Sequence, residues 1–176
     1  LGLYKEEVRI LDDLNNRLKK LEVVEVITVC PNCYDYFEDK LQVKIVSIYE
    51  KLLELGIGQA IEGDMQVFRP CPDRIKNRWL SWMSPYLKGE VHVIEEAQCC
   101  GLGGCAGVKE PELAKSMPQA LKKYNHIYTY CGTCAGQLRR NGCENVSHML
   151  TDILEVHEKP DTRKSLMNRI KSKFWR

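Results

Sequence analysis

Apolar positions along the chain switch between helical and strand-like spacing from the first residues onward. In the first stretch they recur at steps of three and four: Val8, Leu11, Leu14, Leu18 and Leu21. This spacing predicts an amphipathic helix over residues 5–20. The β-branched run that follows, residues 23–29, predicts a strand. Pro31 then stands where the first turn of a helix accepts proline.

The same alternation continues through the rest of the chain. Strands are expected at residues 65–69, 91–94 and 127–130. Helices are expected at residues 48–55, 73–87, 111–123, 133–141 and 149–156, with Pro85 and Pro118 disturbing two of them. One apolar side of the helix at 73–87 is expected to enter the core: Ile75, Trp79, Trp82, Met83 and Tyr86. The predicted fold is therefore α/β, with repeated strand–helix units forming parallel sheets that carry helices on their faces.

Cysteines follow the predicted strands. Cys30, Cys71, the pair Cys99–Cys100 and Cys131 each come just after a strand and before a helix or a glycine-rich loop. In a parallel sheet the carboxyl ends of the strands share one edge, where open α/β sheets place their sites. Because neighbouring strands lie about 4.8 Å apart, cysteines distant in the sequence are expected to converge at that edge.

Five of the nine cysteines form one pattern: Cys71, then Cys99–Cys100–Gly101, then Cys131-Gly-Thr-Cys134. Two residues between thiols suit a turn that directs both sulfurs at one metal, or a redox disulfide at a helix start. Gly101, Gly103 and Gly104 allow close backbone approach and offer N–H groups to sulfur. Sulfur-only ligation favours iron–sulfur or zinc. Five ligands are one more than tetrahedral zinc or a four-cysteine cubane cluster needs.

This array resembles the cysteine-rich CCG domain of heterodisulfide reductase, which also occurs in iron–sulfur subunits of glycolate, lactate and glycerol-3-phosphate oxidising systems. Residues 130–136, with His148 downstream, fit the family well, whereas residues 68–74 match its His-Asp-Pro-Cys-like stretch only partly. The resemblance implies a non-cubane [4Fe–4S] centre held by five cysteines: Cys71, Cys99, Cys100, Cys131 and Cys134. It further implies an oxidoreductase component that exchanges electrons with a thiol/disulfide substrate or with iron–sulfur or flavoprotein subunits.

The family usually carries two such repeats, and Cys30-Pro-Asn-Cys33 resembles the closing C-x-x-C of a first one. The expected organisation is the end of a first CCG-like repeat plus a connection at 1–62, a complete CCG domain at 63–157, and a basic amphipathic C-terminal helix at 158–176. Either the first repeat has degenerated or the chain is a fragment that lacks the first Cys-Cys-Gly, and we expect the fragment. Cys30 and Cys33 join the metal-site candidates, with zinc as an alternative occupant.

A zinc-binding or thiol-only interaction module is the second interpretation, in which both C-x-x-C pairs clamp zinc between lobes. Cys105 is a candidate further ligand or disulfide partner, whereas Cys143 is expected to be an ordinary half-buried thiol. The four histidines show no metal-binding spacing, and His148 is expected to cap or pack near the last helix of the domain. Glu95 and Glu96 are expected in solvent. The glycine pattern lacks the dinucleotide fingerprint.

Composition narrows the class further. A chain of 176 residues with 44% hydrophobic content buries about 70% of its unfolded surface without help from a metal. A net charge of +2 does not indicate the basic surface that nucleic-acid binding needs. The absence of a signal peptide and the odd cysteine number favour a reducing, cytoplasmic compartment. Basic residues gather at 159–176, and their spacing predicts an amphipathic helix. We expect this helix to dock on the domain or to contact a subunit or a membrane surface.

Overall fold

The computed structural model describes residues 3–103, 106–156, 161 and 164–174. The elements in chain order are α1 (Tyr4–Lys20), β1 (Glu25–Thr28), α2 (Pro31–Phe37), β2 (Lys44–Ser47), α3 (Ile48–Leu55), β3 (Ile61–Glu62), β4 (Met65–Val67), α4 (Asp73–Lys76), α5 (Arg78–Met83), η1 (Ser84–Tyr86), β5 (Leu87–Lys88), β6 (Val91–Val93), α6 (Ala106–Lys109), α7 (Pro111–Ser116), η2 (Met117–Lys123), β7 (Ile127–Thr129), α8 (Gly132–Arg140), β8 (Val146–His148), α9 (Met149–Ile153) and α10 (Ser165–Lys173).

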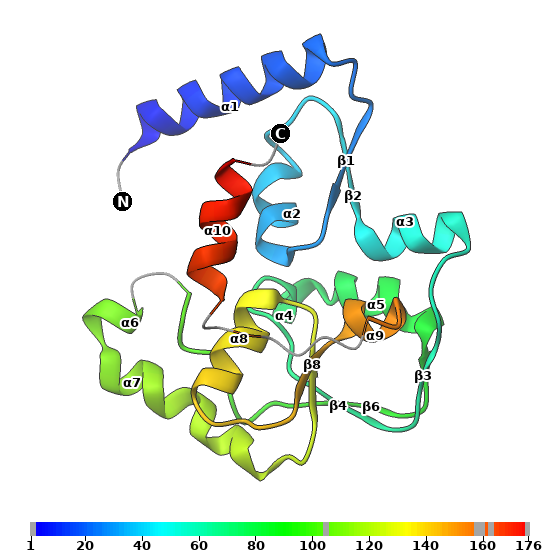
Figure 1. Cartoon of the computed structure of the whole chain (residues 1–176), viewed down its shortest axis with the longest axis vertical. Coiled ribbons are helices and arrows are strands. Elements are labelled where there is room, and N and C mark those ends of the chain that lie inside the picture. The colour runs from blue at the N-terminus through cyan, green and yellow to red at the C-terminus, as the bar shows by residue number, and fades with distance from the viewer. Residues whose placement is uncertain (1–2, 104–105, 157–160, 162–163, 175–176) are drawn as a thin grey trace.

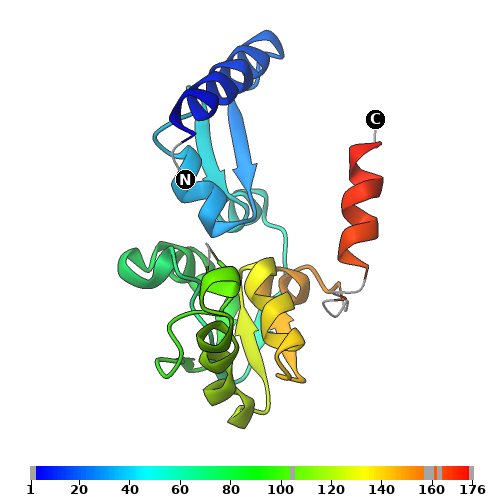
Figure 2. The same ribbon diagram turned by 90° about the vertical axis from the view of Figure 1, so that its left-hand side faces the viewer.

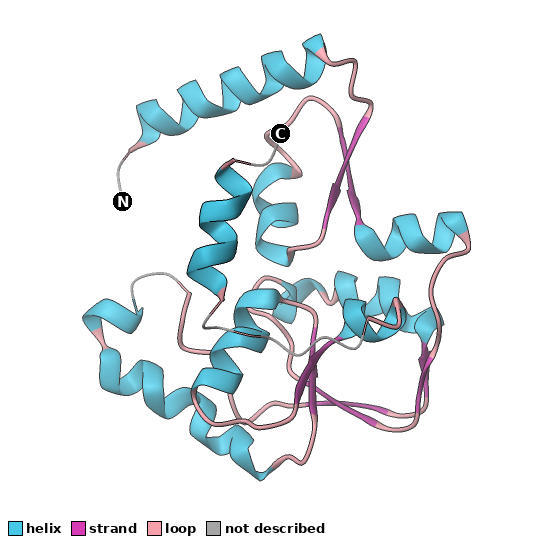
Figure 3. Ribbon diagram, in the orientation of Figure 1, coloured by secondary structure: helices cyan, strands magenta, loops and turns pink. Residues whose placement is uncertain are grey.

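The strands pair in parallel throughout the described residues, which confirms the predicted α/β class. β1 pairs with β2, β3 pairs with β5, and a four-stranded sheet has the order β6-β4-β7-β8. Figure 1 and Figure 3 show helices packed around this larger sheet. In Figure 2 the pair β1–β2 forms a separate layer with α1 and α2.

Two parts of the chain repeat the same order of elements. The series β1–α2–β2–α3 matches the series β7–α8–β8–α9. Cys30 and Cys131 are the N-cap residues of α2 and α8, and Ser47 and His148 are the N-cap residues of α3 and α9. Both pairs are separated by 101 residues in the sequence. The repeat inferred from the two C-x-x-C segments therefore extends to the secondary structure around them.

Two clusters of buried residues form the core. The first is rich in aromatic side chains and includes Tyr34, Tyr49, Trp79 and Tyr130, so it joins the β1–β2 layer to the larger sheet. The second cluster includes four cysteines, Cys100, Cys131, Cys134 and Cys143, among side chains such as Phe68, Leu121 and Leu138. The cysteine array is thus built into the core of the larger sheet rather than displayed on its surface.

The continuous helix expected at 73–87 is wrong. The chain forms α4, breaks at Asn77 in the left-handed conformation (φ 50°), and resumes as α5, η1 and β5. The break turns Ile75 outward, where its side chain is 95% exposed, whereas Trp79 and Tyr86 are buried as predicted. The helix at 111–123 likewise becomes α7 followed by η2, with Pro118 near the start of the second segment.

The C-terminal helix α10 stands apart from the rest of the chain in Figure 2. Its apolar residues Met167, Ile170 and Phe174 are 55%, 46% and 75% exposed. The expectation that α10 docks on the domain therefore differs from the structure. None of the helices in the described part of the chain is long and apolar enough to cross a membrane.

Candidate metal centre

Three neighbouring strands deliver the five cysteines. Cys71 follows β4, Cys99 and Cys100 follow β6, and Cys131 follows β7, and these strands are adjacent in the order β6-β4-β7. The sequence prediction that their carboxyl ends share one edge is confirmed for these residues. It is wrong for Cys30, because β1 belongs to the separate β1–β2 sheet.

Cys131 and Cys134 occupy the N-cap and N3 positions of α8, so their side chains face each other across the first helical turn. The Cys134 side chain hydrogen-bonds to the Cys131 thiolate, and the backbone N–H groups of Cys134 and Thr133 add to this bond. Together they lower the pKa of Cys131 to about 6, although burial opposes the shift. These hydrogen bonds favour the thiolate of Cys131, the form that binds metal.

The pKa of Cys100 is lowered in the same way. The largest cause is its hydrogen bond with Cys134, and the backbone N–H of Leu102 helps to lower the pKa of Cys100 to about 6. Cys134 lies between two thiolates, and its hydrogen bonds to Cys100 and Cys131 raise its own pKa. Hydrogen bonds through Cys134 therefore link these three buried thiols into one group.

Cys71 and Cys99 form the outer part of the array. Burial first, and then the charge and hydrogen bond of Cys99, raise the pKa of Cys71, with the charge of Cys100 adding to the effect. The backbone N–H of Gly101 donates to the Cys99 sulfur over 3.3 Å. Cys71 is exposed, whereas Cys100 is buried. The five thiols thus run from the core to the surface, and all are free.

Gly101 makes the Cys-Cys-Gly loop fit against α7. Its backbone has φ +83°, and a Cβ atom built on it would lie 2.1 Å from the Ala114 carbonyl oxygen. Only glycine fits there without a shift of the backbone. A Cβ atom on Gly103 would meet nothing within 4 Å. The free thiols, the two thiolates and the N–H donors of this loop are a donor set that suits an iron–sulfur cluster.

Cys30 and Cys33 repeat the geometry of the second pair. They are the N-cap and N3 residues of α2, and the two side chains hydrogen-bond to each other. Burial, followed by the bond and charge of Cys30, raises the pKa of Cys33 to about 11, and the charge of Cys131 adds to this. Cys33 therefore lies within electrostatic reach of Cys131, although the two residues come from different sheets.

Residues 87–139 match the family model described as CCG, cysteine-rich domain. This segment is a CCG cysteine-rich domain. The match includes Cys99, Cys100, Cys131 and Cys134 and leaves Cys71 outside. No curated protein matches the chain. The structure is similar to glutamate racemase isoform RacE1 from Bacillus anthracis, with a TM-score of 0.41 and 13% identity over 96% of this chain and 66% of the racemase. The chain thus spans about two thirds of the racemase, and a similarity this distant carries no functional inference.

Within the part of the chain that the structure describes, no three His, Cys, Asp or Glu side chains are arranged to hold one metal ion. A zinc ion draws all its ligands to one atom, with Zn–S bonds of about 2.3 Å. A cluster with several iron atoms distributes its thiolates over them.

Other candidates lie apart from the CCG array. Cys143 is fully rather than half buried, and burial raises its pKa. His148 caps α9 as predicted, since its Nδ1 accepts from the Leu150 N–H over 3.3 Å. Glu96 is not freely solvated, because it binds Lys123 and Tyr124 over 2.6 Å each. Cys105 and His157 lie outside the described residues.

A buried carboxylate behind the CCG array was missed from the sequence. Asp73 accepts hydrogen bonds from the Trp79 N–H (3.1 Å), the Leu80 N–H (3.3 Å) and the Tyr130 hydroxyl (2.7 Å). It stands two residues after Cys71, and Tyr130 immediately precedes Cys131. Asp73 therefore ties the two segments that carry these cysteines to each other. The sequence signal that could have indicated this buried role is the position of Asp73 between Pro72 and a Trp-rich helix.

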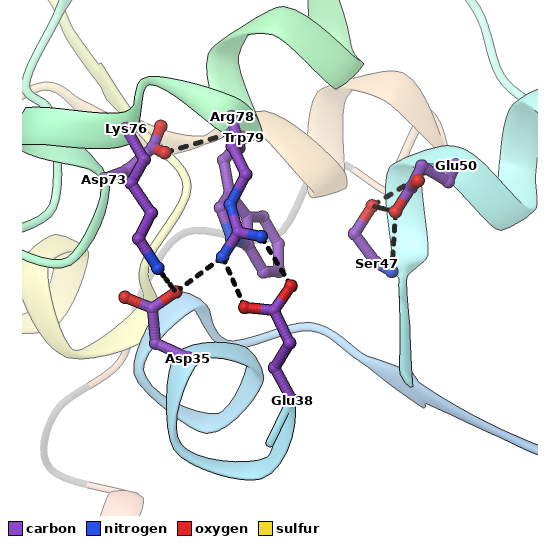
Figure 4. Close-up of polar contacts among 8 residues, drawn as sticks. All are labelled: Asp35, Glu38, Ser47, Glu50, Asp73, Lys76, Arg78 and Trp79. Atoms are coloured by element: carbon purple, nitrogen blue, oxygen red, sulfur yellow. Dashed lines mark hydrogen bonds and ion pairs between the residues drawn. The ribbon is translucent and has the colours of Figure 1, made fainter. Parts of the chain in front are cut away.

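Arg78 of α5 binds the acidic residues of α2 (Figure 4). Its guanidinium binds Asp35 over 3.0 Å and Glu38 over 2.5 Å, and lies 5.0 Å from the centre of the Tyr34 ring. Trp79, the next residue, packs edge-on against Tyr34 at 5.9 Å and stacks on Tyr130 at 6.5 Å. These contacts explain how Cys33 comes to lie near Cys131.

Proposed function

We propose that this chain is an iron–sulfur redox protein resembling the CCG-containing component of heterodisulfide reductase. In this proposal, the five cysteines of the array hold one [4Fe–4S] cluster of non-cubane type: Cys71, Cys99, Cys100, Cys131 and Cys134. Electrons pass between this centre and a thiol/disulfide substrate or a partner redox protein. The chain then acts as a component of an oxidoreductase.

The observation that carries the proposal is the linked group of Cys100, Cys131 and Cys134. Hydrogen bonds from Cys134 and from backbone N–H groups lower the pKa values of Cys100 and Cys131 to about 6, which favours their anionic form in the core. Burying two like charges side by side is costly unless a cation or a proton compensates them. Here the Cys134 thiol keeps its proton and donates toward both neighbouring sulfurs, which provides partial compensation. Iron would compensate the charges fully and release that proton.

The surrounding residues have distinct parts in this proposal. Backbone N–H groups of Gly101, Leu102 and Thr133 donate to the sulfurs and favour their anionic form. Asp73 and Tyr130 hold the loops of Cys71 and Cys131 in register. A bound cluster would supply one-electron transfer. The exposed position of Cys71 gives a substrate or partner an approach to the array.

Anaerobic reconstitution tests the proposal. The chain is incubated with ferrous iron and sulfide without oxygen, desalted, and assayed for iron, acid-labile sulfide and an EPR signal. We expect iron and sulfide to be retained in equal amounts, and Cys131→Ala or Cys100→Ala to lose most of both. Cys143→Ala is the matched control, because Cys143 is also buried but lies outside the array.

Two results would contradict the proposal. One is a colourless protein that retains no iron although circular dichroism shows it folded. The other is one equivalent of zinc with no sulfide after purification without added metal, which would favour the zinc-module interpretation. Equal loss of iron in the Cys143 and Cys131 variants would point to general unfolding, and thermal melts of the apoproteins separate that case.

A further inference from the structure

Cys30 and Cys33 form a second thiol pair with its own surroundings. They stand at N-cap and N3 of α2, and their side chains interact directly with each other. Pro31 at the first helical position is buried, which fixes the turn between them. Cys33 is exposed and Cys30 is half-buried, and both are free thiols. One sulfur of the pair is therefore open to an incoming molecule, while the other stands behind it.

A metal ion is a poor occupant for this pair. Tetrahedral zinc needs four ligands, and two thiols supply only half of them. Asp35 and Glu38, the acidic residues that follow on α2, are bound to Arg78. These carboxylates stabilise the packing of α2 and α5 instead of serving as ligands.

We propose that Cys30 and Cys33 are a reversible dithiol/disulfide couple that exchanges with low-molecular-weight or peptide disulfides. Two residues between cysteines at a helix start is a spacing at which a disulfide closes without rearrangement of the backbone. The N-cap and N3 positions place the two thiols on the same first turn of α2, where their side chains hydrogen-bond to each other. The couple requires no metal, so it goes beyond the proposed iron–sulfur function and does not depend on it.

The exchange balances in atoms and electrons. Cys33 first loses its proton to solvent, and its thiolate attacks one sulfur of the incoming disulfide, whose other half leaves as a thiolate and takes up a proton. Because the pKa of Cys33 is raised to about 11, this first step is slow near neutral pH and becomes faster as the pH rises. Cys30 then loses its proton and attacks the Cys33 sulfur of the mixed disulfide, which releases the second thiol. The two cysteines are oxidised by two electrons, and the substrate disulfide is reduced to two thiols. An added dithiol reverses the sequence.

The exposure of the two sulfurs sets the order of these steps. An incoming disulfide reaches the exposed Cys33 before the half-buried Cys30. Cys30 is already in contact with Cys33, so the second step is intramolecular and fast relative to attack by another molecule. A long-lived mixed disulfide on Cys33 is therefore not expected while Cys30 is present.

Redox titration of the intact, metal-free chain tests the couple. The protein is equilibrated without oxygen in mixtures of reduced and oxidised glutathione, free thiols are blocked with N-ethylmaleimide, and trypsin is added. Cleavage at Lys20 and Lys40 places both cysteines on the peptide 21–40. We expect this peptide to change from doubly blocked to internally disulfide-bonded as oxidised glutathione increases. Dithiothreitol should reverse the change.

Single variants identify the order of attack. In Cys30→Ser, Cys33 should accumulate as the glutathione mixed disulfide at least tenfold above the intact pair. In Cys33→Ser, Cys30 should react much more slowly. Cys143→Ala should leave the titration of peptide 21–40 unchanged, because Cys143 lies in a different core cluster. Circular dichroism of each variant shows whether α2 remains folded.

Three outcomes would overturn the couple. The first is a peptide 21–40 that stays doubly blocked at every glutathione ratio. The second is a disulfide from Cys33 to Cys131 in place of the bond to Cys30. The third is stoichiometric zinc or iron that protects Cys30 and Cys33 from N-ethylmaleimide in the intact chain and is lost in Cys30→Ser. A cluster that fails to form at the five-cysteine array leaves the titration of this peptide unaffected.

Discussion

Replacing Gly101 with alanine tests how closely the Cys-Cys-Gly loop is fitted against α7. The new Cβ atom would lie 2.1 Å from the Ala114 carbonyl oxygen and 3.0 Å from its carbonyl carbon. Both atoms belong to the backbone, so no side-chain rotation relieves the contact. The loop or α7 must move, and such a movement carries Cys99 and Cys100 with it.

The expected cost has two parts. An L-residue held at φ +83° costs roughly 1–2 kcal/mol relative to glycine. Forcing a methyl group into a packed site typically costs about 1–3 kcal/mol more. The sum is roughly 2–5 kcal/mol, a large share of the about 5–15 kcal/mol that stabilises a typical domain. For a chain of this length, that corresponds to a fall in Tm on the order of 10 °C.

Gly103 provides the matched control within the same loop. A Cβ atom at Gly103 meets nothing within 4 Å, and its φ lies outside the left-handed region. We expect Gly103→Ala to change the free energy of unfolding by less than about 0.5 kcal/mol. Urea unfolding of both metal-free variants gives the difference directly. After reconstitution, Gly101→Ala should also retain less iron than Gly103→Ala.

Equal unfolding midpoints for the two alanine variants would refute this reasoning. That result would mean that the loop moves away from α7 at little cost. The geometry of the Cys99 and Cys100 sulfurs would then not depend on the contact with Ala114. A normal midpoint together with lost iron binding would instead show that Gly101 matters through its N–H bond to Cys99 alone.

Three further outcomes are expected. Asp73→Ala should lower the free energy of unfolding in urea by about 3 kcal/mol or more, because it strands two backbone N–H groups and a hydroxyl, whereas Tyr130→Phe should cost about 1 kcal/mol. A hydrogen bond from Arg78 holds the pKa of Glu38 below its ordinary value. The contribution of this pair to folding stability is therefore complete above the ordinary pKa of glutamate and is lost as the pH falls through the lowered pKa of Glu38. Urea midpoints measured down to about pH 3 should therefore fall less steeply in Arg78→Gln. Burial lowers the pKa of His148 to about 4, so its protonation opposes folding, and stability falls with pH below the ordinary value. His148→Asn keeps an N-cap acceptor and should lessen the loss between about pH 6.5 and 4, measured by the same unfolding series.

Hydrophobic spacing predicted the longer elements well. The apolar steps of α1 and the capping residues Ser47 and Gly56 of α3 are local signals, and each acts through contacts within a few residues. The strands β2 and β8 were missed because each runs directly into the helix that follows it, without a loop to mark its end. Their existence depends on pairing with β1 and β7, which is a tertiary contact.

The break at Asn77 shows a local signal that competes with a stronger pattern. Asparagine tolerates the left-handed conformation better than most residues, so its presence was a usable sign. The apolar spacing from Ile75 to Met83 favoured one continuous helix instead. The buried carboxylate of Asp73 decides the outcome, because it accepts the N–H groups of Trp79 and Leu80 at the start of α5. That bond depends on burial, which the sequence does not display.

The approach of Cys33 to Cys131 is the part of the site that spacing could not predict. The strands that precede these residues belong to different sheets, so strand pairing does not set their separation. It is set by Trp79, which packs against Tyr34 beside one thiol pair and against Tyr130 beside the other. The two C-x-x-C helices therefore share one aromatic support. A change at Trp79 is expected to disturb both thiol pairs together, whereas a change in either sheet acts on its own pair first.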